Sequence, residues 1–418
     1  MSTAPAVPED AADAGEIAAA LREAPFVRVV AAADGDALAA SGVLARACRE
    51  HSTPFQVRVD SVPDPTPGEG DDLVLGVGVS GGDVALAGAD PASLVAADAV
   101  RQLGVDPDPM LALAGVASAN HPLDAGEAAT LLDAARQRTT VERRPGLATP
   151  TADLADGLAH STLVHASVSG DPEAARATLS ELGVPSDPTD EDRRRLASWL
   201  AIESTASSAR AAEAVERALR PYATPDAPFA TLDGFGDALD AVARERPGTG
   251  VALAIRGDGL RSAVLDAWRD HARAVHEALT AATTGRYDGV FVARVDVDGV
   301  DPGRLGTVAR LCRDFQSPEP VVLVVSAAAD AGIEGAAAAA RVEGAAAAAR
   351  VEGAAAAARV EGAAAAASTD DAPLADAMRE AVQSVDADGS SAGDARRATA
   401  RFDDGEVSRF VTAFREAL

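Results

Sequence analysis

Two aspartates separated by a single glycine, Asp34 and Asp36, are the residues of this sequence best placed for chemistry. They follow the apolar run PFVRVVAAA (25–33) and precede ALAASGVLARACRE (37–50), so we expect a buried strand to give way to a helix here. In open α/β sheets ligands collect at the carboxyl ends of strands, and paired carboxylates there suit Mg²⁺ or Mn²⁺. Asp-Gly-Asp is also ordinary turn chemistry and Asp36 a good helix N-cap, so both interpretations stay open.

The segments around these aspartates alternate between expected strands and helices, which is typical of a doubly wound, mostly parallel sheet. Expected strands are FQVRVD (55–60), LVLGVGV (73–79), VALAG (84–88), VALAIRG (251–257), GVFVARVDV (289–297), PVVLVVSAA (320–328) and 397–402. Expected helices are 93–104 with a C-cap at Gly104, most of 109–225, 259–284, 373–384 and the last residues of the chain, with a Gly/Ser loop at 388–394.

These elements predict an α/β protein in which a helical connector joins the first sheet to a second, smaller α/β domain. The predicted divisions are an N-terminal acidic segment and helix (1–24), the first α/β domain (25–150), the helical region and connector (151–284) and the second domain (285–418).

An alanine-rich repeat interrupts the second domain at residues 334–367. The nonapeptide EGAAAAARV occurs three times and a fourth copy fades into STDD. Five consecutive alanines favour helix, but successive copies would point to opposite sides of that helix and give no continuous apolar stripe. We therefore expect an insertion produced by replication slippage in a tolerant surface loop, with a partner-binding helix as the alternative.

The composition describes an acidic protein that is still apolar enough to fold. Asp and Glu number 65 against 37 basic residues, all of them arginine, for a net charge of -28. This balance indicates adaptation to molar salt, where exposed like charges are screened within about 3 Å. It argues against a protein that coats nucleic acid through a positive surface, and the regular apolar patterning excludes a disordered acidic tail.

Other sequence features suggest a cytoplasmic protein without a structural metal. Cys48 and Cys312 form no ligand-spaced pair, which fits a reducing compartment. No signal peptide and no apolar run long enough for a membrane span are found. Two histidine pairs have a spacing of five, which misses the helical metal spacings, so they are interpreted as surface or interface residues: His160 with His165, and His271 with His276.

The strand-turn-helix segment RVVAAADGDALAASGVLARACRE (28–50) resembles the first motif of the DHH phosphoesterase superfamily, which includes the RecJ single-strand exonucleases. DDLVLGVGVSGGDVALAGADP and SLVAADAVRQLGVDPDPMLALAGVASAN are similar to the segments that carry the next motifs. DADGSSAGDARRATARFDDGEVSRFVTAFREAL is similar to the end of the DHH-associated domain. The resemblance covers roughly residues 25–125 and 285–418, and it implies the fold of that superfamily.

Most ligand positions implied by the resemblance hold other residues. The first-motif histidine is replaced within Ala31–Ala33, and the second-motif aspartate falls near Gly76 or Gly78. The Asp-His-His signature falls at Ala87–Ala89 and the fourth-motif aspartate near Ala119 or Asn120, while the C-terminal Gly-Gly-Gly-His becomes Gly389, Ser390, Ser391 and Ala392. Only Asp34 and Asp36 remain, as vestigial ligands. Two carboxylates from one turn cannot hold two cations roughly 4 Å apart.

The hypothesis that follows is a catalytically degenerate RecJ-like scaffold or accessory factor in DNA replication or repair, with no cofactor expected. The resemblance implies partners of the helicase (MCM) or GINS type, as for the RecJ-like protein of the replication helicase, and no membrane partner.

The alternative is a divergent phosphoesterase that uses Mn²⁺ or Mg²⁺ to cleave single-stranded nucleic acid or short oligonucleotides. It needs replacement ligands such as Asp83, Asp90 or Asp98. In either case the resemblance places a basic cluster where it could contact the phosphates of a single strand, unless surrounding carboxylates neutralise it; its members are Arg396, Arg397 and Arg401.

Overall fold

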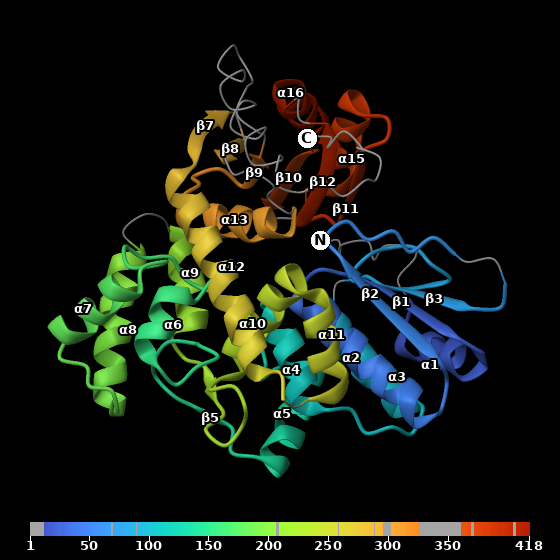
Figure 1. Cartoon of the computed structure of the whole chain (residues 1–418), viewed down its shortest axis with the longest axis horizontal. Coiled ribbons are helices and arrows are strands. Elements are labelled where there is room, and N and C mark those ends of the chain that lie inside the picture. The colour runs from blue at the N-terminus through green and yellow to red at the C-terminus, as the bar shows by residue number, and fades with distance from the viewer. Residues whose placement is uncertain are drawn as a thin grey trace, which may run out of the picture.

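A computed structural model describes most of the chain, and the two sheets and the helices between them lie within the described part (Figure 1). The described residues are 12–67, 70–88, 90–205, 209–257, 259–287, 289–295, 302–326, 361–368, 372–403 and 407–418.

The first sheet has four parallel strands in the order β2-β1-β3-β4. Its strands are β1 (Val27–Ala32), β2 (Phe55–Asp60), β3 (Leu73–Val77) and β4 (Val84–Leu86). Residues of β1 alternate: Val27, Val29 and Ala31 are buried, whereas Arg28 on the opposite face is exposed. This alternation shows that one face of β1 packs on the helices and the other meets solvent.

The helices packed against this sheet bring the ends of distant segments together. They are α1 (Ala14–Glu23), α2 (Gly35–Glu50), α3 (Ala92–Gln102), α4 (Pro109–Ser118), α5 (Gly126–Arg138), α10 (Leu232–Glu245) and α11 (Pro247–Arg256). Helix α2 contacts α3, α4, α10 and α11, and its middle residues from Ala37 to Ala45 are buried. Because Ala, Ser and Gly fill much of α2, neighbouring helices can approach its backbone closely.

A group of helices lies to one side of the first sheet and leads to α12 (Arg261–Ala281), the long helix that runs toward the second sheet (Figure 1). Its elements are β5 (Glu142–Arg143), α6 (Leu154–His160), α7 (Pro172–Glu181), α8 (Asp190–Thr205), α9 (Ala209–Ala218) and β6 (Tyr222–Ala223), where β5 and β6 pair as a short antiparallel ladder.

The second sheet has six strands in the order β11-β12-β10-β9-β8-β7. The β8–β9 pair is parallel and the other pairs are antiparallel. Its elements are β7 (Thr283–Tyr287), β8 (Val290–Val295), α13 (Pro302–Phe315), β9 (Val321–Ser326), β10 (Glu361–Ser368), α15 (Leu374–Val385), β11 (Ser390–Gly393), β12 (Arg397–Asp403) and α16 (Val407–Ala417). The α/β class, with a parallel sheet and a second sheet-containing unit, is confirmed; the exact domain divisions stay a prediction.

Strand β10 is the last copy of the alanine repeat, and it lies inside the second sheet between β9 and β12. Ala365 and Ala367 belong to the core on the α13 side, while Ala364 and Ala366 belong to the core under α15 and α16. The expected surface loop is therefore wrong for this copy. Backbone pairing on both edges outweighs the helix preference of alanine, and methyl side chains let helices approach both faces. The three earlier copies lie outside the described residues.

Two further local predictions are wrong. The segment expected as a strand at 251–257 belongs to helix α11, because Pro247 opens that helix and Gly257, at φ 83°, closes it. A short apolar run does not distinguish a strand from a buried helix. Part of the expected Gly/Ser loop at 388–394 forms the edge strand β11, which pairs with β12.

Candidate functional site: a carboxylate and arginine cluster

The first site residue, Asp34, follows the carboxyl end of β1 and is the N-cap of α2. Its Oδ1 accepts a hydrogen bond from the backbone N–H of Ala37 at 2.8 Å. A carboxylate at this position satisfies an unpaired N–H of the first helical turn. The cap interpretation left open by the sequence is therefore correct in geometry, although it belongs to Asp34 rather than to Asp36.

Asp36 lies in the first turn of α2 and reaches across to the start of α3. Its carboxylate accepts hydrogen bonds from the backbone N–H groups of Ala92 and Ser93 at 2.7 and 3.0 Å. The Ser93 hydroxyl donates a third, at 2.5 Å. All three bonds serve the N-terminal turn of α3, so Asp36 fastens two crossover helices to one another.

A third carboxylate, Asp240, reaches the same place from α10. Its Oδ1 accepts a hydrogen bond from the Gly35 N–H at 3.0 Å and another from the Ser118 hydroxyl at 3.3 Å. Gly35 permits this approach, since a Cβ there would lie 2.9 Å from the Asp240 nitrogen. Sequence reasoning missed Asp240, which is 205 residues from Gly35 and lies on a helix that carries no motif.

Arginines surround these carboxylates from three elements. Arg244, one turn after Asp240 on α10, forms an ion pair with it at 2.6 Å. Arg310 of α13 and Arg397 of β12 lie within electrostatic reach of Asp240, and Arg397 also of Asp34. Because β12 belongs to the second sheet and α13 packs against it, the cluster includes charges from both halves of the molecule.

The electrostatics of the carboxylates follow from burial and from these arginines. Burial raises the pKa of Asp34, and the nearby charge of Arg397 opposes that rise. Burial and then the charge of Asp34 raise the pKa of Asp36 to about 6. Burial also acts on Asp240, but the charge of Arg244 outweighs it and holds the pKa well below its usual range. Asp240 is therefore the most firmly ionised of the three.

The pKa values of two of these arginines, Arg310 and Arg397, shift in opposite directions. Desolvation lowers the pKa of the Arg310 guanidinium, which donates to the carbonyl oxygen and hydroxyl of Thr162. Desolvation acts on Arg397 too, but the carboxylates of Asp34 and Asp240 outweigh it and raise its pKa. Arg397 is nevertheless exposed to solvent, so it acts on the carboxylates through its charge while its side chain remains accessible to water.

The described residues include no group of three or more His, Cys, Asp or Glu side chains that could hold a metal ion. The replacement ligands required by the phosphoesterase alternative do not join Asp34 and Asp36. Asp83 accepts a hydrogen bond from the Val74 N–H, Asp98 bonds to Gln102, and Asp90 is exposed.

The histidines are more buried than their sequence interpretation as surface or interface residues suggested. His160, His271 and His276 are each at most 3% exposed. Rings of His165 and His276 stack, with their Nδ1 atoms 3.2 Å apart. Because this pair forms between the α6–α7 segment and α12 rather than along one helix, the spacing of five gave no sign of it.

The predicted nucleic-acid residues separate into different environments. Arg397 is within electrostatic reach of Asp34 and Asp240, whereas Arg401 contacts Asp60 at 3.6 Å and Ser61 at 3.4 Å, at the end of β2. The backbone of Arg396 bonds to Asp394 and its side chain is exposed. With Thr399, which donates to the Ser61 carbonyl oxygen at 2.8 Å, Arg401 fastens β12 to the end of β2. Their nucleic-acid role stays a prediction.

The two sheets and the helices that join them form an α/β protein whose fold is similar to that of CDC45. A solved structure of CDC45 from Entamoeba histolytica aligns with a TM-score of 0.57 over 96% of this chain and 97% of that chain, at 9% identity. RecJ in complex with Mg²⁺ from Thermus thermophilus aligns with a TM-score of 0.44, covering 96% of this chain and 52% of that chain at 14% identity.

The sequence relationship is closer to a haloarchaeal protein. Uncharacterized protein rrnAC1427 of Haloarcula marismortui is 42% identical over 426 residues and is covered along its whole length, as is this chain. The model described as "Uncharacterized protein rrnAC1427, C-terminal domain" matches residues 282–362 and 352–416. The chain belongs to the rrnAC1427 family. Its helices, where described, include none with the length and apolarity to cross a membrane.

Proposed function

We propose that this protein is a catalytically degenerate RecJ-like protein that serves as a scaffold or accessory factor in DNA replication or repair. The observation that carries the proposal is that the carboxylates of Asp34, Asp36 and Asp240 are already occupied by hydrogen bonds and an ion pair within the protein. Their oxygens bond to helix N-terminal N–H groups, to hydroxyls and to an arginine. Carboxylates held in this way stabilise helix junctions, whereas a two-cation phosphodiesterase needs four or more ligands left to bind metal.

The cluster also explains how the charge of these carboxylates is balanced in such a protein. Arg310 and Arg397 bring positive charge from the second sheet to carboxylates that follow the first sheet. In the proposed scaffold these guanidinium groups supply countercharge to the carboxylates.

The full-length likeness to CDC45 agrees with the proposal at the level of fold. The proposed partners are helicase or GINS-type replication proteins, and contact of the exposed Arg396 and Arg397 with a single strand is a secondary proposal. Purification of the tagged protein from its native host in molar KCl, followed by identification of bound proteins, tests this part. Absence of every replication and repair protein from the bound fraction contradicts it.

A nuclease assay tests the second part of the proposal, that the protein does not cleave nucleic acid. Purified protein in molar KCl with Mn²⁺ is incubated with end-labelled single strands and short oligonucleotides, beside Asp34→Ala and the surface variant Asp98→Ala. We expect no cleavage above a no-protein control from any of the three. Processive cleavage that Asp34→Ala abolishes and Asp98→Ala retains overturns the proposal in favour of a divergent phosphoesterase.

A further inference from the structure

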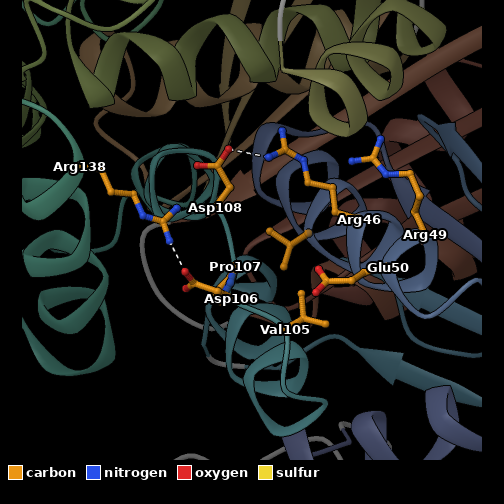
Figure 2. A pocket seen from close by; sticks show the side chains of 9 residues that line it. Arg46, Arg49, Glu50, Val105, Asp106, Pro107, Asp108 and Arg138 are labelled. Atoms are coloured by element: carbon orange, nitrogen blue, oxygen red, sulfur yellow. Dashed lines mark hydrogen bonds and ion pairs between the residues drawn. The ribbon is translucent and has the colours of Figure 1, made fainter.

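A cavity of about 470 Å³ lies beside α2 and the turn between α3 and α4 (Figure 2). Its lining is neutral, because three arginines are matched by three carboxylates: Arg46 with Asp108, Arg138 with Asp106, and Arg49 next to Glu50. The cavity therefore has no excess charge that would select a ligand. The place of β10 in the second sheet is more selective, since it holds one of four nearly identical segments of the chain.

The four copies of the alanine repeat differ at a single position of the strand. β10 has the sequence EGAAAAAS, and each earlier copy has EGAAAAAR at the corresponding residues. The position of Ser368 thus corresponds to Arg341, Arg350 and Arg359. Every copy would bring the same glycine and five alanines to the pairing with β9 and β12. The last residue is therefore the one difference by which the sheet can distinguish the copies.

The connection before β10 is long enough for an earlier copy to take its place. Ser326 at the end of β9 pairs with Ala363, so the two strands adjoin there, and residues 327–360 join them. Adjacent antiparallel strands need only about two residues between them. If the first copy formed the strand, residues 327–333 would still remain for the connection, and the entropy of loop closure depends only weakly on length. Chain length therefore does not decide which copy is used.

Ser368 lies at the end of β10 in surroundings that fit a small, uncharged side chain. It is 2% exposed, and strand alternation places its side chain on the face of Ala364 and Ala366, under α15 and α16. Its N–H donates to the Arg396 carbonyl oxygen at 3.0 Å, and its own carbonyl oxygen accepts from the Arg313 Nη1 at 3.1 Å. The Oγ, in contrast, is buried without a hydrogen-bond partner among the described residues.

An arginine at this position would bring a charge into surroundings that leave even a hydroxyl unpaired. A guanidinium has five N–H donors, and burying it without acceptors costs far more than burying a hydroxyl. Arg313, which reaches this end of the strand, adds a like charge, and its own carboxylate partner is Asp314 at 2.7 Å. The end of β10 thus favours serine over arginine.

We propose that Ser368 selects the fourth copy of the repeat as β10, because the arginine at the corresponding position excludes the other three copies from the sheet. This residue fixes the register of a chain that could otherwise pair in four registers, each with a different length of chain between the strand and α15. A repeat that grows or shrinks by whole copies then leaves the sheet unchanged, as long as its last copy ends in serine. The inference does not depend on the proposed scaffold function.

A rescue experiment tests this selection. Ala365→Asp places a carboxylate in the buried part of β10, so the full-length chain has to use an earlier copy and bury its arginine. We expect the folding equilibrium constant to fall about tenfold or more, equivalent to about 1.4 kcal/mol, in urea denaturation followed by circular dichroism in molar KCl. Adding Arg359→Ser gives the third copy the sequence of β10 and should restore the midpoint of the parent protein.

Two matched variants control for the substitutions themselves. Arg359→Lys in the Ala365→Asp chain keeps a charge at the end of the third copy and should give no recovery. Ala356→Asp makes the same change at the corresponding position of the third copy, in an identical local sequence. Because that copy is not the strand in the parent protein, this variant should have the parent midpoint.

Four results overturn the inference. They are an Ala365→Asp chain as stable as the parent, no recovery on adding Arg359→Ser, equal recovery with Arg359→Lys, and a loss from Ala356→Asp as large as that from Ala365→Asp. An Ala365→Asp chain that does not fold still permits the rescue measurement. Since every readout is a folding midpoint, these outcomes are separate from the nuclease assay and the partner identification that test the proposed function.

Discussion

The junction after β1 and the strand β10 are both central to their sheets, but they are held by different forces. At the junction, Asp34, Asp36 and Asp240 bond to backbone and hydroxyl donors, and arginines neutralise their charge. In β10 the described side chains from Ala364 to Ala367 are methyl groups that form no polar contact, and each is at most 2% exposed.

The junction after β1 therefore depends on the identity of its charged side chains, whereas β10 depends only on the small size of its side chains. The junction needs particular charges, because removing one partner leaves another group buried and unpaired. Strand β10 needs only small side chains and intact backbone pairing, so a copied run of alanines can serve as a sheet strand. The following predictions test both halves of this comparison, starting with the variant expected to cost most stability.

The largest effect is expected from a charge in β10. Ala365→Asp places a carboxylate in the core beneath α13, where burial without a partner costs more than about 4 kcal/mol. The variant is made in a chain that lacks residues 334–360, so that no earlier run of five alanines can take the place of β10. Chemical denaturation followed by circular dichroism measures the loss.

The control for this variant is Ala392→Asp in the same background, on the edge strand β11, where the side chain is only partly buried. We expect it to change the free energy of unfolding by less than about 1 kcal/mol. Equal stability of the two variants would contradict the placement of β10 in the centre of the sheet.

The second effect is expected at the junction. Asp240→Ala removes the acceptor of the Gly35 N–H and the carboxylate partner of Arg244, whose guanidinium keeps only its hydrogen bond to the backbone carbonyl of residue 240; the change should cost about 3 kcal/mol. The double variant with Arg244→Ala should cost less than the sum of the two single variants, because it removes the unpaired charge as well. Urea denaturation midpoints in molar KCl give the three values.

The matched control is Asp72→Ala, which removes the partner of Arg28 on the exposed face of the first sheet. This pair is largely solvated, so its loss should cost less than about 1 kcal/mol. If Asp240→Ala costs no more than Asp72→Ala, the cluster does not hold the junction.

The sequence predicts a feature of these two regions when the residues that form it are close together along the chain, and fails when they are far apart. The strand end at Asp34 and the fold class follow from local apolar patterning, which survives in this chain. Asp240, Arg310 and Arg397 could not be assigned to the site, because they reach it from α10, α13 and β12 and no spacing rule links them. For β10 the local preference of alanine points to helix, and only pairing with β9 and β12 reverses it.

A smaller effect, visible as a pH dependence, is expected from Asp36. Its pKa is raised to about 6 by burial and by the charge of Asp34, so the folded protein binds this proton more tightly than the unfolded chain. Stability from this group therefore increases as the pH falls from about 7 toward 4, by about 1 to 3 kcal/mol. Asp36→Asn does not titrate and should lack that part of the slope.

Denaturation midpoints of the parent protein and Asp36→Asn at pH 8, 6.5 and 5 measure this difference. The advantage of the parent protein over the variant should grow toward pH 5. A difference that stays constant over the three pH values would mean that Asp36 titrates in its ordinary range. Asp98→Asn, on α3 outside the cluster, is the control for the substitution itself and is measured at the same three pH values.

The smallest effect, and one of opposite sign, is expected from the repeat itself. Deleting residues 334–360 removes three copies and leaves 327–333 to join β9 to β10, because the fourth copy already supplies the strand. A roughly fivefold shorter connection reduces the entropy cost of closing that loop by about 1.4 kcal/mol. The deletion should therefore raise the denaturation midpoint slightly, whereas deletion of 361–369, which removes β10 in place of a redundant copy, forces the chain to recruit an earlier one. A recruited copy would place an arginine where β10 has the buried Ser368, so the second deletion should lower the midpoint; equal midpoints for the two deletions would show that the run of five alanines is all that β10 requires.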